Sequence, residues 1–227
     1  MRPVSYLMLG SAPLLAFFLY LYFKRHYTRE FSRLLFQSYI AGGAGVLLLL
    51  VFEFFSIKLG LSNLRSLNRI IFYSFITVGI SSELGKFIIL RYFIIPKNKI
   101  TRPIDAIALS IMISLGFSSI ALILFIFNIL NIQSLFPATL YAFVLIPANI
   151  MFSVIMVFFI GMAKILKTRV VFSLTGLFVA AFFHGIFNFC MLTSDFKLLS
   201  LFSFGSTIIV LVLGLKAAFS SPELSEQ

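Results

Sequence analysis

Two polar side chains interrupt an apolar stretch in the last quarter of the chain. Residues 180–192 read AAFFHGIFNFCML, with His184 and Asn188 four positions apart. This spacing places both side chains on one face of a helix, and each would cost roughly 2–7 kcal/mol if buried without a partner. An imidazole can act as a base or bind a metal, whereas asparagine is a poor zinc ligand. The pair therefore indicates a metal or catalytic site, a polar clasp between helices, or the remnant of a former site.

A second polar group lies in the segment VGISSELGKFIIL at residues 78–90. Glu83 and Lys86 are three positions apart, within reach of each other on one helical face. They can form a neutralising pair that lets both charges exist in a membrane. Alternatively, Glu83 acts as a general base or metal ligand while Lys86 holds its charge. Asn149, in LIPANIMFS, is a further amide that we expect to bond between helices.

Other polar and small residues have simpler explanations. Glu53 lies near Lys58, and we expect it to reach the membrane interface or to be paired. Asp105 falls in a first helical turn, where an acid complements the helix dipole. The run GGAG at 42–45 allows close helix packing, and the single cysteine, Cys190, excludes an intramolecular disulfide.

The elements that must position these residues are membrane helices. The chain has 227 residues, of which 61% are hydrophobic and 11% charged, with a mean hydropathy of +1.10. Soluble domains carry about 25% charged residues, and the apolar runs here reach the ~20 residues that cross a bilayer. We therefore predict an all-α integral membrane protein, a single polytopic domain over residues 1–227 with a polar tail at 220–227. About seven transmembrane helices in one bundle are expected, near 4–23, 34–57, 70–95, 104–130, 138–162, 170–192 and 198–219.

The basic residues predict the orientation of this bundle. Eleven fall on one side of the predicted membrane: Lys24, Arg25, Arg29, Arg33, Lys97, Lys99, Arg102, Lys164, Lys167, Arg169 and Lys216. Five fall on the other: Arg2, Lys58, Arg65, Arg69 and Lys197. The richer side is expected to be cytoplasmic, which places the N-terminus outside and the C-terminus in the cytoplasm. We predict a bacterial cytoplasmic membrane, with anionic lipids bound at the basic loops and no nucleic acid bound.

Several fragments occur in the order found in a known family. S-E-L-G-K at 82–86, P-I-D-A-I and S-L-G-F within 103–117, P-A-N-I-M-F-S at 147–153 and H-G-I-F-N-F at 184–189 resemble the PrsW-type intramembrane proteases. These are grouped with the CAAX prenyl proteases and the bacteriocin-immunity proteins. The resemblance defines a PrsW-like core at residues 70–192. It implies a site of motif residues on several helices.

The first two motifs of that family are only partly present. Its E-E-x-x-K motif keeps Glu83 and Lys86, but Ser82 replaces the first glutamate. Its F-x-x-x-E motif keeps Phe117, whereas Ala121 stands where the acid is expected. The resemblance therefore places Ser82 and Phe117 beside the site as binding residues.

The last two motifs have changed in the same direction. A histidine expected on the next span falls on Asn149, which we class as a binding residue. The H-x-x-x-D motif keeps His184 and has Asn188 in place of the acid, a form that also occurs in the CAAX branch. An asparagine can orient a group by hydrogen bonding, but it cannot accept a proton as a base.

These losses predict a protease-like fold without hydrolytic activity. A catalytic zinc ion needs three protein ligands and a water, and a carboxylate mechanism needs two acids with separated pKa values. We therefore expect Glu83, Lys86, His184 and Asn188 to be remnant positions, no cofactor, and a membrane protein, transmembrane peptide or lipid as partner. One alternative is a divergent active protease, metal- or glutamate-dependent, with zinc on Glu83 and His184. A transporter or channel subunit is a second alternative.

Overall fold

The structure is a computed structural model that describes residues 3–97, 102–127, 129, 138–165 and 169–219. Within these ranges the secondary structure is helical and no strand occurs. The elements are α1 (Pro3–His26), α2 (Arg29–Ala44), α3 (Val46–Lys58), α4 (Leu67–Phe72), η1 (Tyr73–Ile80), α5 (Ser81–Ile88), η2 (Ile89–Ile94), η3 (Ile95–Lys97), α6 (Pro103–Ile126), α7 (Ala138–Ile165), α8 (Arg169–Thr193) and α9 (Phe196–Phe219).

The predicted all-helical membrane fold is confirmed. In the described part of the chain, six helical stretches are long and apolar enough to cross a membrane: Arg29–Lys58, Leu67–Ile94, Pro103–Ile126, Val144–Gly161, Val170–Thr193 and Phe196–Lys216. The first predicted span coincides with α1, a helix of 24 residues. The chain is therefore an integral membrane protein with a multi-pass helical bundle.

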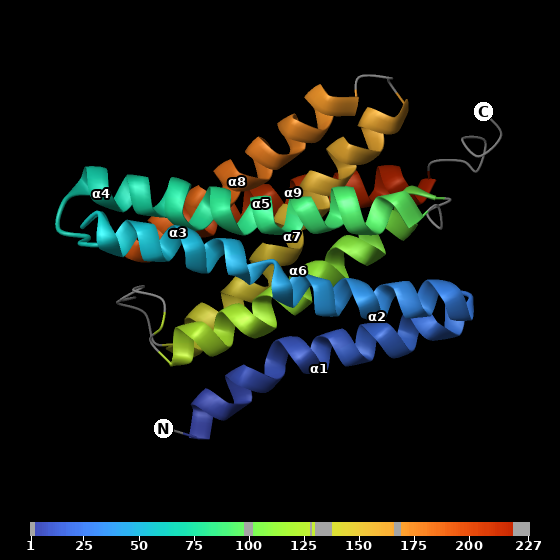
Figure 1. Cartoon of the computed structure of the whole chain (residues 1–227), viewed down its shortest axis with the longest axis horizontal. Helices are drawn as coiled ribbons and strands as arrows, with labels where there is room; N and C mark the ends of the chain where they lie inside the picture. Colours follow the sequence, from blue (N-terminus) through green and yellow to red (C-terminus); the bar gives the residue numbers. More distant parts are fainter. Residues whose placement is uncertain (1–2, 98–101, 128, 130–137, 166–168, 220–227) are drawn as a thin grey trace.

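The helices run back and forth between two ends of the bundle (Figure 1). The ends of α1, η3, α7 and α9 lie toward one end with the starts of α2, α6 and α8. The starts of α1, α4, α7 and α9 lie toward the other. For the basic residues within the described ranges, this arrangement places the two groups toward opposite ends, as the predicted spans require. Which end faces the cytoplasm stays a prediction.

The second predicted span is two helices, and it begins earlier than expected. The predicted loop after α1 is only the turn Tyr27–Thr28, because the Thr28 hydroxyl caps α2 by accepting a hydrogen bond from the Phe31 backbone N–H at 3.3 Å. The helix is then interrupted at Gly45, which separates α2 from α3. The glycine-rich run at this point has low helix propensity, which favours the break.

Small residues let the central helices approach closely. A methyl group on Gly42 would collide with the carbonyl oxygen of Ile113, and one on Gly116 would collide with that of Tyr39. These contacts pack α2 against α6. The packing role predicted for residues 42–45 is therefore confirmed.

The third span contains two segments of wide helical turns. It runs from Leu67 to Lys97, and the π-helical segments η1 and η2 flank the short α-helix α5. In an 18-residue stretch of this span, 72% of the residues are buried, and the same share is buried in α6. In the corresponding stretch of α9 only 11% are buried. The third span and α6 thus form the interior of the bundle, and α9 lies at its periphery.

Candidate functional site: a buried polar cluster

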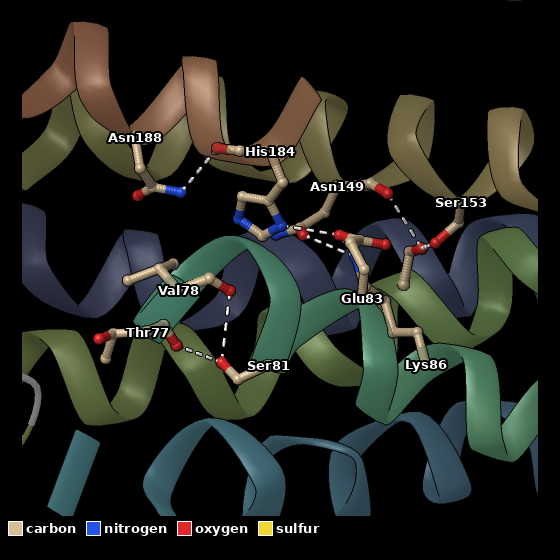
Figure 2. Close-up of polar contacts among 10 residues, drawn as sticks. Thr77, Val78, Ser81, Glu83, Lys86, Asn149, Ser153, His184 and Asn188 are labelled. Carbon is tan, nitrogen blue, oxygen red and sulfur yellow. Dashed lines mark hydrogen bonds and ion pairs between the residues drawn. The ribbon is translucent and has the colours of Figure 1, made fainter. Parts of the chain in front are cut away.

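The polar residues singled out in the sequence converge in the interior of the bundle. Glu83 and Lys86 lie on α5, Asn149 on α7 and His184 on α8, and Figure 2 shows their side chains pointing toward one another. All four are at most 2% exposed. We call Glu83, Lys86, Asn149 and His184 the polar cluster.

One oxygen of Glu83 is the centre of this cluster. Glu83 Oε1 accepts a hydrogen bond from Lys86 Nζ at 2.6 Å and lies 2.7 Å from His184 Nδ1. When His184 carries a proton on Nδ1, it donates that proton to the same oxygen. Burial makes such charge-assisted contacts stronger than they would be in water. The carboxylate therefore joins a helix of the third span to α8.

Lys86 makes further contacts in the cluster. Its ammonium donates to Asn149 Oδ1 at 3.0 Å, and it lies 5.1 Å from the centre of the Phe117 ring. The ring face is a favourable surface for a desolvated cation. Phe117 therefore lies beside the site, as the resemblance implied.

Packing on α8 sets the orientation of His184. Its ring stacks on Phe152 of α7, with 4.9 Å between ring centres and an angle of 29°. The next residue, Gly185, leaves space for Phe75, because a methyl group there would collide with the Phe75 ring. A methyl group on Gly79 would likewise lie 2.8 Å from the carbonyl oxygen of Ala181. These close approaches bring η1 and α8 together next to the cluster.

A small hydroxyl network supports the Asn149 backbone. Ser114 on α6 donates either to the Asn149 carbonyl oxygen, at 3.1 Å, or to the hydroxyl of Ser153, with which it is also in contact. All three residues are at most 1% exposed. The network fixes α7 against α6 beside the cluster, and Figure 2 shows Asn149 and Ser153 on that side.

Two buried polar atoms of the cluster have no hydrogen-bond partner among the described residues: Glu83 Oε2 and Asn149 Nδ2. The hydroxyl of Ser82, the residue before Glu83, is in the same state. Buried polar groups are rarely left unpartnered. The two cluster atoms offer an oxygen acceptor and an N–H donor to a polar ligand. The cluster is therefore incomplete as a set of hydrogen bonds.

Asn188 does not join the cluster in the way the sequence indicated. Its side-chain amide donates to the backbone carbonyl oxygen of His184, at 3.1 Å, within its own helix. The expected pairing of Glu83 with Lys86 is found, and Asn149 contacts the Lys86 ammonium of that pair. A residue at i+4 can satisfy its amide on the preceding turn, which explains this outcome.

Glu53 also differs from the expectation that it reaches the membrane interface. It is 2% exposed and accepts a hydrogen bond from the hydroxyl of Tyr73, at 2.7 Å. The expectation of a partner is correct. We expected Glu53 to lie near the interface because Lys58 follows it by five residues.

Some residues that shape the site were not identified from the sequence. Phe152 and Ser153 follow Asn149 by three and four positions, which is the spacing of one helical face. That signal was available in the sequence. The role of Ser114 depends on the contact between α6 and α7 and could not be deduced from spacing.

The donor set does not fit a catalytic zinc ion. Among the described residues, no group of three or more His, Cys, Asp and Glu side chains is placed to hold a metal. Glu83 and His184 provide two suitable ligands, but the ammonium of Lys86 already contacts the shared oxygen at 2.6 Å. Amides such as that of Asn149 are poor substitutes for a third ligand.

Comparison with known proteins identifies the family. The PrsW family intramembrane metalloprotease matches residues 30–215. Protease PrsW of Geobacillus kaustophilus is 27% identical over 84% of this chain and 81% of its own length. Protease PrsW of Oceanobacillus iheyensis is 28% identical over 83% of both chains, and that of Bacillus subtilis is 27% identical over 80% of both. No solved structure matches the chain significantly. Since the family match covers most of the chain, the protein belongs to the PrsW family of intramembrane metalloproteases.

Proposed function

We propose that this PrsW-family protein is catalytically inactive and binds a transmembrane segment of another membrane protein in its protease-like fold. The observation that carries the proposal is that Asn149, where the resemblance leads us to expect a histidine, lies in the cluster and accepts a hydrogen bond from Lys86 Nζ at 3.0 Å. An amide therefore occupies the place of a base or metal ligand beside Glu83.

The residue types at the motif positions support this proposal. Ser82, Ala121 and Asn149 stand where the resemblance leads us to expect two acids and a histidine. Asn149 is part of the polar cluster, and Ser82, which precedes Glu83 in the chain, is also buried. Neither side chain can serve as a general base at neutral pH.

The metal of the family does not fit this chain, so we derive no step through it. A dication beside Glu83 would lie close to the Lys86 ammonium, which repels it. A third ligand of suitable type is lacking among the described residues. We therefore base the proposed function of the cluster on its own side chains, without a metal ion.

Binding needs fewer groups than hydrolysis. Glu83 Oε2 and Asn149 Nδ2 have no hydrogen-bond partner among the described residues. Together they match the N–H and C=O groups of a peptide bond. In a membrane, polar side chains contribute to helix association by hydrogen bonding between helices, and the cluster provides such groups. A transmembrane segment with a locally unwound or polar stretch has the complementary chemistry.

A second candidate function is metal-free, glutamate-dependent peptide hydrolysis. It is favoured by the contact of His184 Nδ1 with Glu83 Oε1 at 2.7 Å together with the unpartnered Oε2. In this mechanism Glu83 takes a proton from a water molecule, whose oxygen attacks the peptide carbonyl carbon. The C–N bond then breaks, and the amine leaves with the proton. Among the described residues no second carboxyl group contacts Glu83 to assist the leaving group, which is why we rank this mechanism second.

One experiment separates the two candidates. The full-length protein, labelled with a donor fluorophore, is reconstituted in liposomes with a panel of acceptor-labelled single-span peptides. Energy transfer measures binding, and mass spectrometry detects cleavage products. We expect binding of at least one peptide to weaken in Asn149→Ala and to persist in Asn188→Ala, whose amide bonds only within α8.

The proposal predicts that no cleavage product depends on Glu83. Products that appear with the wild type and vanish in Glu83→Gln would refute inactivity and favour hydrolysis. Binding that is equal in wild type, Asn149→Ala and Glu83→Gln would refute the role of the polar cluster. Thermal unfolding of each variant shows whether it is folded.

A further inference from the structure

The outer pair of helices forms a groove that is separate from the polar cluster. The groove lies between the end of α1 and the start of α2, and it has a volume of about 910 Å³. Its lining includes Tyr20 and Lys24 from α1, and Arg29, Arg33 and Phe36 from α2. Figure 1 shows this pair of helix ends at the same end of the bundle as the start of α6.

The groove has a cationic mouth and an aromatic floor. Lys24 lies in the last turn of α1, and Arg29 and Arg33 lie one turn apart at the start of α2; all three are exposed. One turn further from the helix ends, the rings of Tyr20 and Phe36 meet edge to face with centres 6.4 Å apart. The groove therefore changes from charged to apolar along the helix axes.

The balance of charge in the groove favours an anion. The lining contains three cationic side chains, and Glu30 is its one acidic side chain. Arginine can bind a phosphate group through two parallel N–H donors, and lysine adds a point charge. Two arginines and a lysine facing one opening form a suitable site for a phosphodiester.

The apolar part of the groove favours a lipid over a soluble anion. Phe36 is 55% exposed, and Ile40, four residues further on the same face of α2, is 58% exposed. These side chains continue from the floor of the groove toward the middle of the span Arg29–Lys58. A molecule with a phosphate at one end and a hydrocarbon chain at the other matches both parts.

We propose that the α1–α2 groove is a specific binding site for an anionic phospholipid. Arg29, Arg33 and Lys24 bind the headgroup phosphate, and an acyl chain lies along Phe36 and Ile40. The site does not depend on the polar cluster, so the proposal stands whether or not the protein hydrolyses peptides.

The test is native mass spectrometry of the full-length protein with added phosphatidylglycerol or phosphatidylcholine. The test variant is Arg29→Gln/Arg33→Gln. The matched control is Arg25→Gln/Lys216→Gln, which removes two exposed positive charges near the same end of the bundle but outside the groove lining. We expect preferential binding of phosphatidylglycerol, with affinity falling about fivefold for each groove arginine removed and changing little in the control.

Several results would overturn the proposal. Equal binding of the two lipids would exclude recognition of the headgroup. An equal loss in the test and control variants would show that attraction is diffuse. Displacement of the lipid by inorganic phosphate at matched concentration would identify a soluble anion as the ligand. If the double variant is unfolded in a thermal melt, Lys24→Gln replaces it and is expected to give a single fivefold loss.

Discussion

At the scale of single residues, the main feature is a buried carboxylate with a cationic partner on the same helix. Glu83 and Lys86 are both 0% exposed and 2.6 Å apart. Such a pair contributes little net stability, because desolvating two charges offsets their attraction. Removing one partner destabilises the folded protein strongly, because the other charge stays buried without an opposite charge beside it. The pair is thus a constraint on substitution more than a source of stability.

This constraint gives the first prediction. Lys86→Met should lower the free energy of unfolding by about 3–5 kcal/mol, because Glu83 then remains as a buried charge without its ammonium partner. The double variant Glu83→Gln/Lys86→Met should recover most of that loss. Denaturant unfolding in mixed micelles, followed by circular dichroism, measures both. Equal stability of the single and double variants would contradict the ion-pair interpretation.

At the scale of helices, close packing at glycines positions the elements that carry the cluster. Gly85 on α5 faces Gly45, where a methyl group on Gly85 would collide with the Gly45 carbonyl oxygen. Gly116 on α6 faces Tyr39 of α2 in the same way. These contacts hold α5 and α6 against the α2–α3 junction, so the cluster depends on backbone approach as well as on its own hydrogen bonds.

The second prediction tests this packing. Gly116→Ala should destabilise the protein by about 1–3 kcal/mol, because the added methyl group meets backbone that must shift. The control is Gly205→Ala on the peripheral helix α9, where nothing lies within 4 Å of an added methyl group. That substitution should be neutral or stabilising, since alanine has the higher helix propensity. The prediction fails if both variants have the same melting temperature.

A contact between the α1–α2 turn and the start of α6 gives the third prediction. Burial and the neighbouring Asp105 raise the pKa of Tyr27 to about 12, and the Arg102 guanidinium lies 5.6 Å from the Tyr27 ring. The carboxylate of Asp105 also raises the pKa of Arg102, with which it pairs at 3.2 Å. The pKa of Tyr27 is near 10.0 in the unfolded chain and about 12 in the folded protein. At a pH between these two values, Tyr27 keeps its proton in the folded state and loses it on unfolding. Stability contributed by this group is complete below the lower value and falls as pH rises through that interval.

Unfolding measured across about pH 10 to 12 checks this dependence. Tyr27→Phe should show a shallower decline than the wild type, because it lacks the group that titrates. Tyr92→Phe is the control, since Tyr92 is 67% exposed. An identical decline in Tyr27→Phe and the wild type would contradict the assignment.

At the scale of the whole molecule, the distribution of charge and apolar surface gives the bundle two different ends. The polar cluster lies in the interior, and the basic α1–α2 groove lies at the end where α6 begins. The protein thus combines a buried polar cluster with a basic groove at one end of the bundle. The positive-inside rule predicts that this end is cytoplasmic.

The fourth prediction concerns this orientation. A green fluorescent protein fused after Phe219 should fluoresce in bacteria, and alkaline phosphatase fused at the same position should be inactive. Both results are expected because the basic end is retained in the cytoplasm. Fusions at the start of α4, near Arg65 and Arg69, should behave in the opposite way. Active phosphatase at the C-terminal position would reverse the predicted topology.

Much of the fold follows from hydrophobicity, and part of the site follows from spacing. The apolar runs predicted the spans because a membrane helix must satisfy its own backbone and present an apolar surface. The separation of three between Glu83 and Lys86 predicted their contact for a similar local reason. The contact between His184 and Glu83 joins positions 101 apart. It depends on how α8 packs on the third span, which local patterns do not contain.

Other features were not predictable from local patterns for identifiable reasons. The glycine-rich run at 42–45 favours a break but does not determine that it falls at Gly45. The wide turns of η1 and η2 have no clear signal in the local pattern. Asn188 could bond across helices or to its own helix, and spacing allows both. The structure selects the second arrangement.

The wide turns of η1 have a consequence for how sequences of this family should be aligned. A π-helical turn holds one more residue than an α-helical turn, and η1 lies directly before the helix that carries Glu83. Deleting one residue from 73–80 while restoring regular turns would leave the rotation of the following residues nearly unchanged, because the wide turn accommodates the extra residue. Keeping every residue while making all turns α-helical would instead rotate Glu83 by about 100°, away from the face that meets His184. A one-residue gap at this place in an alignment is therefore compatible with the same site, and it should not be treated as loss of the site.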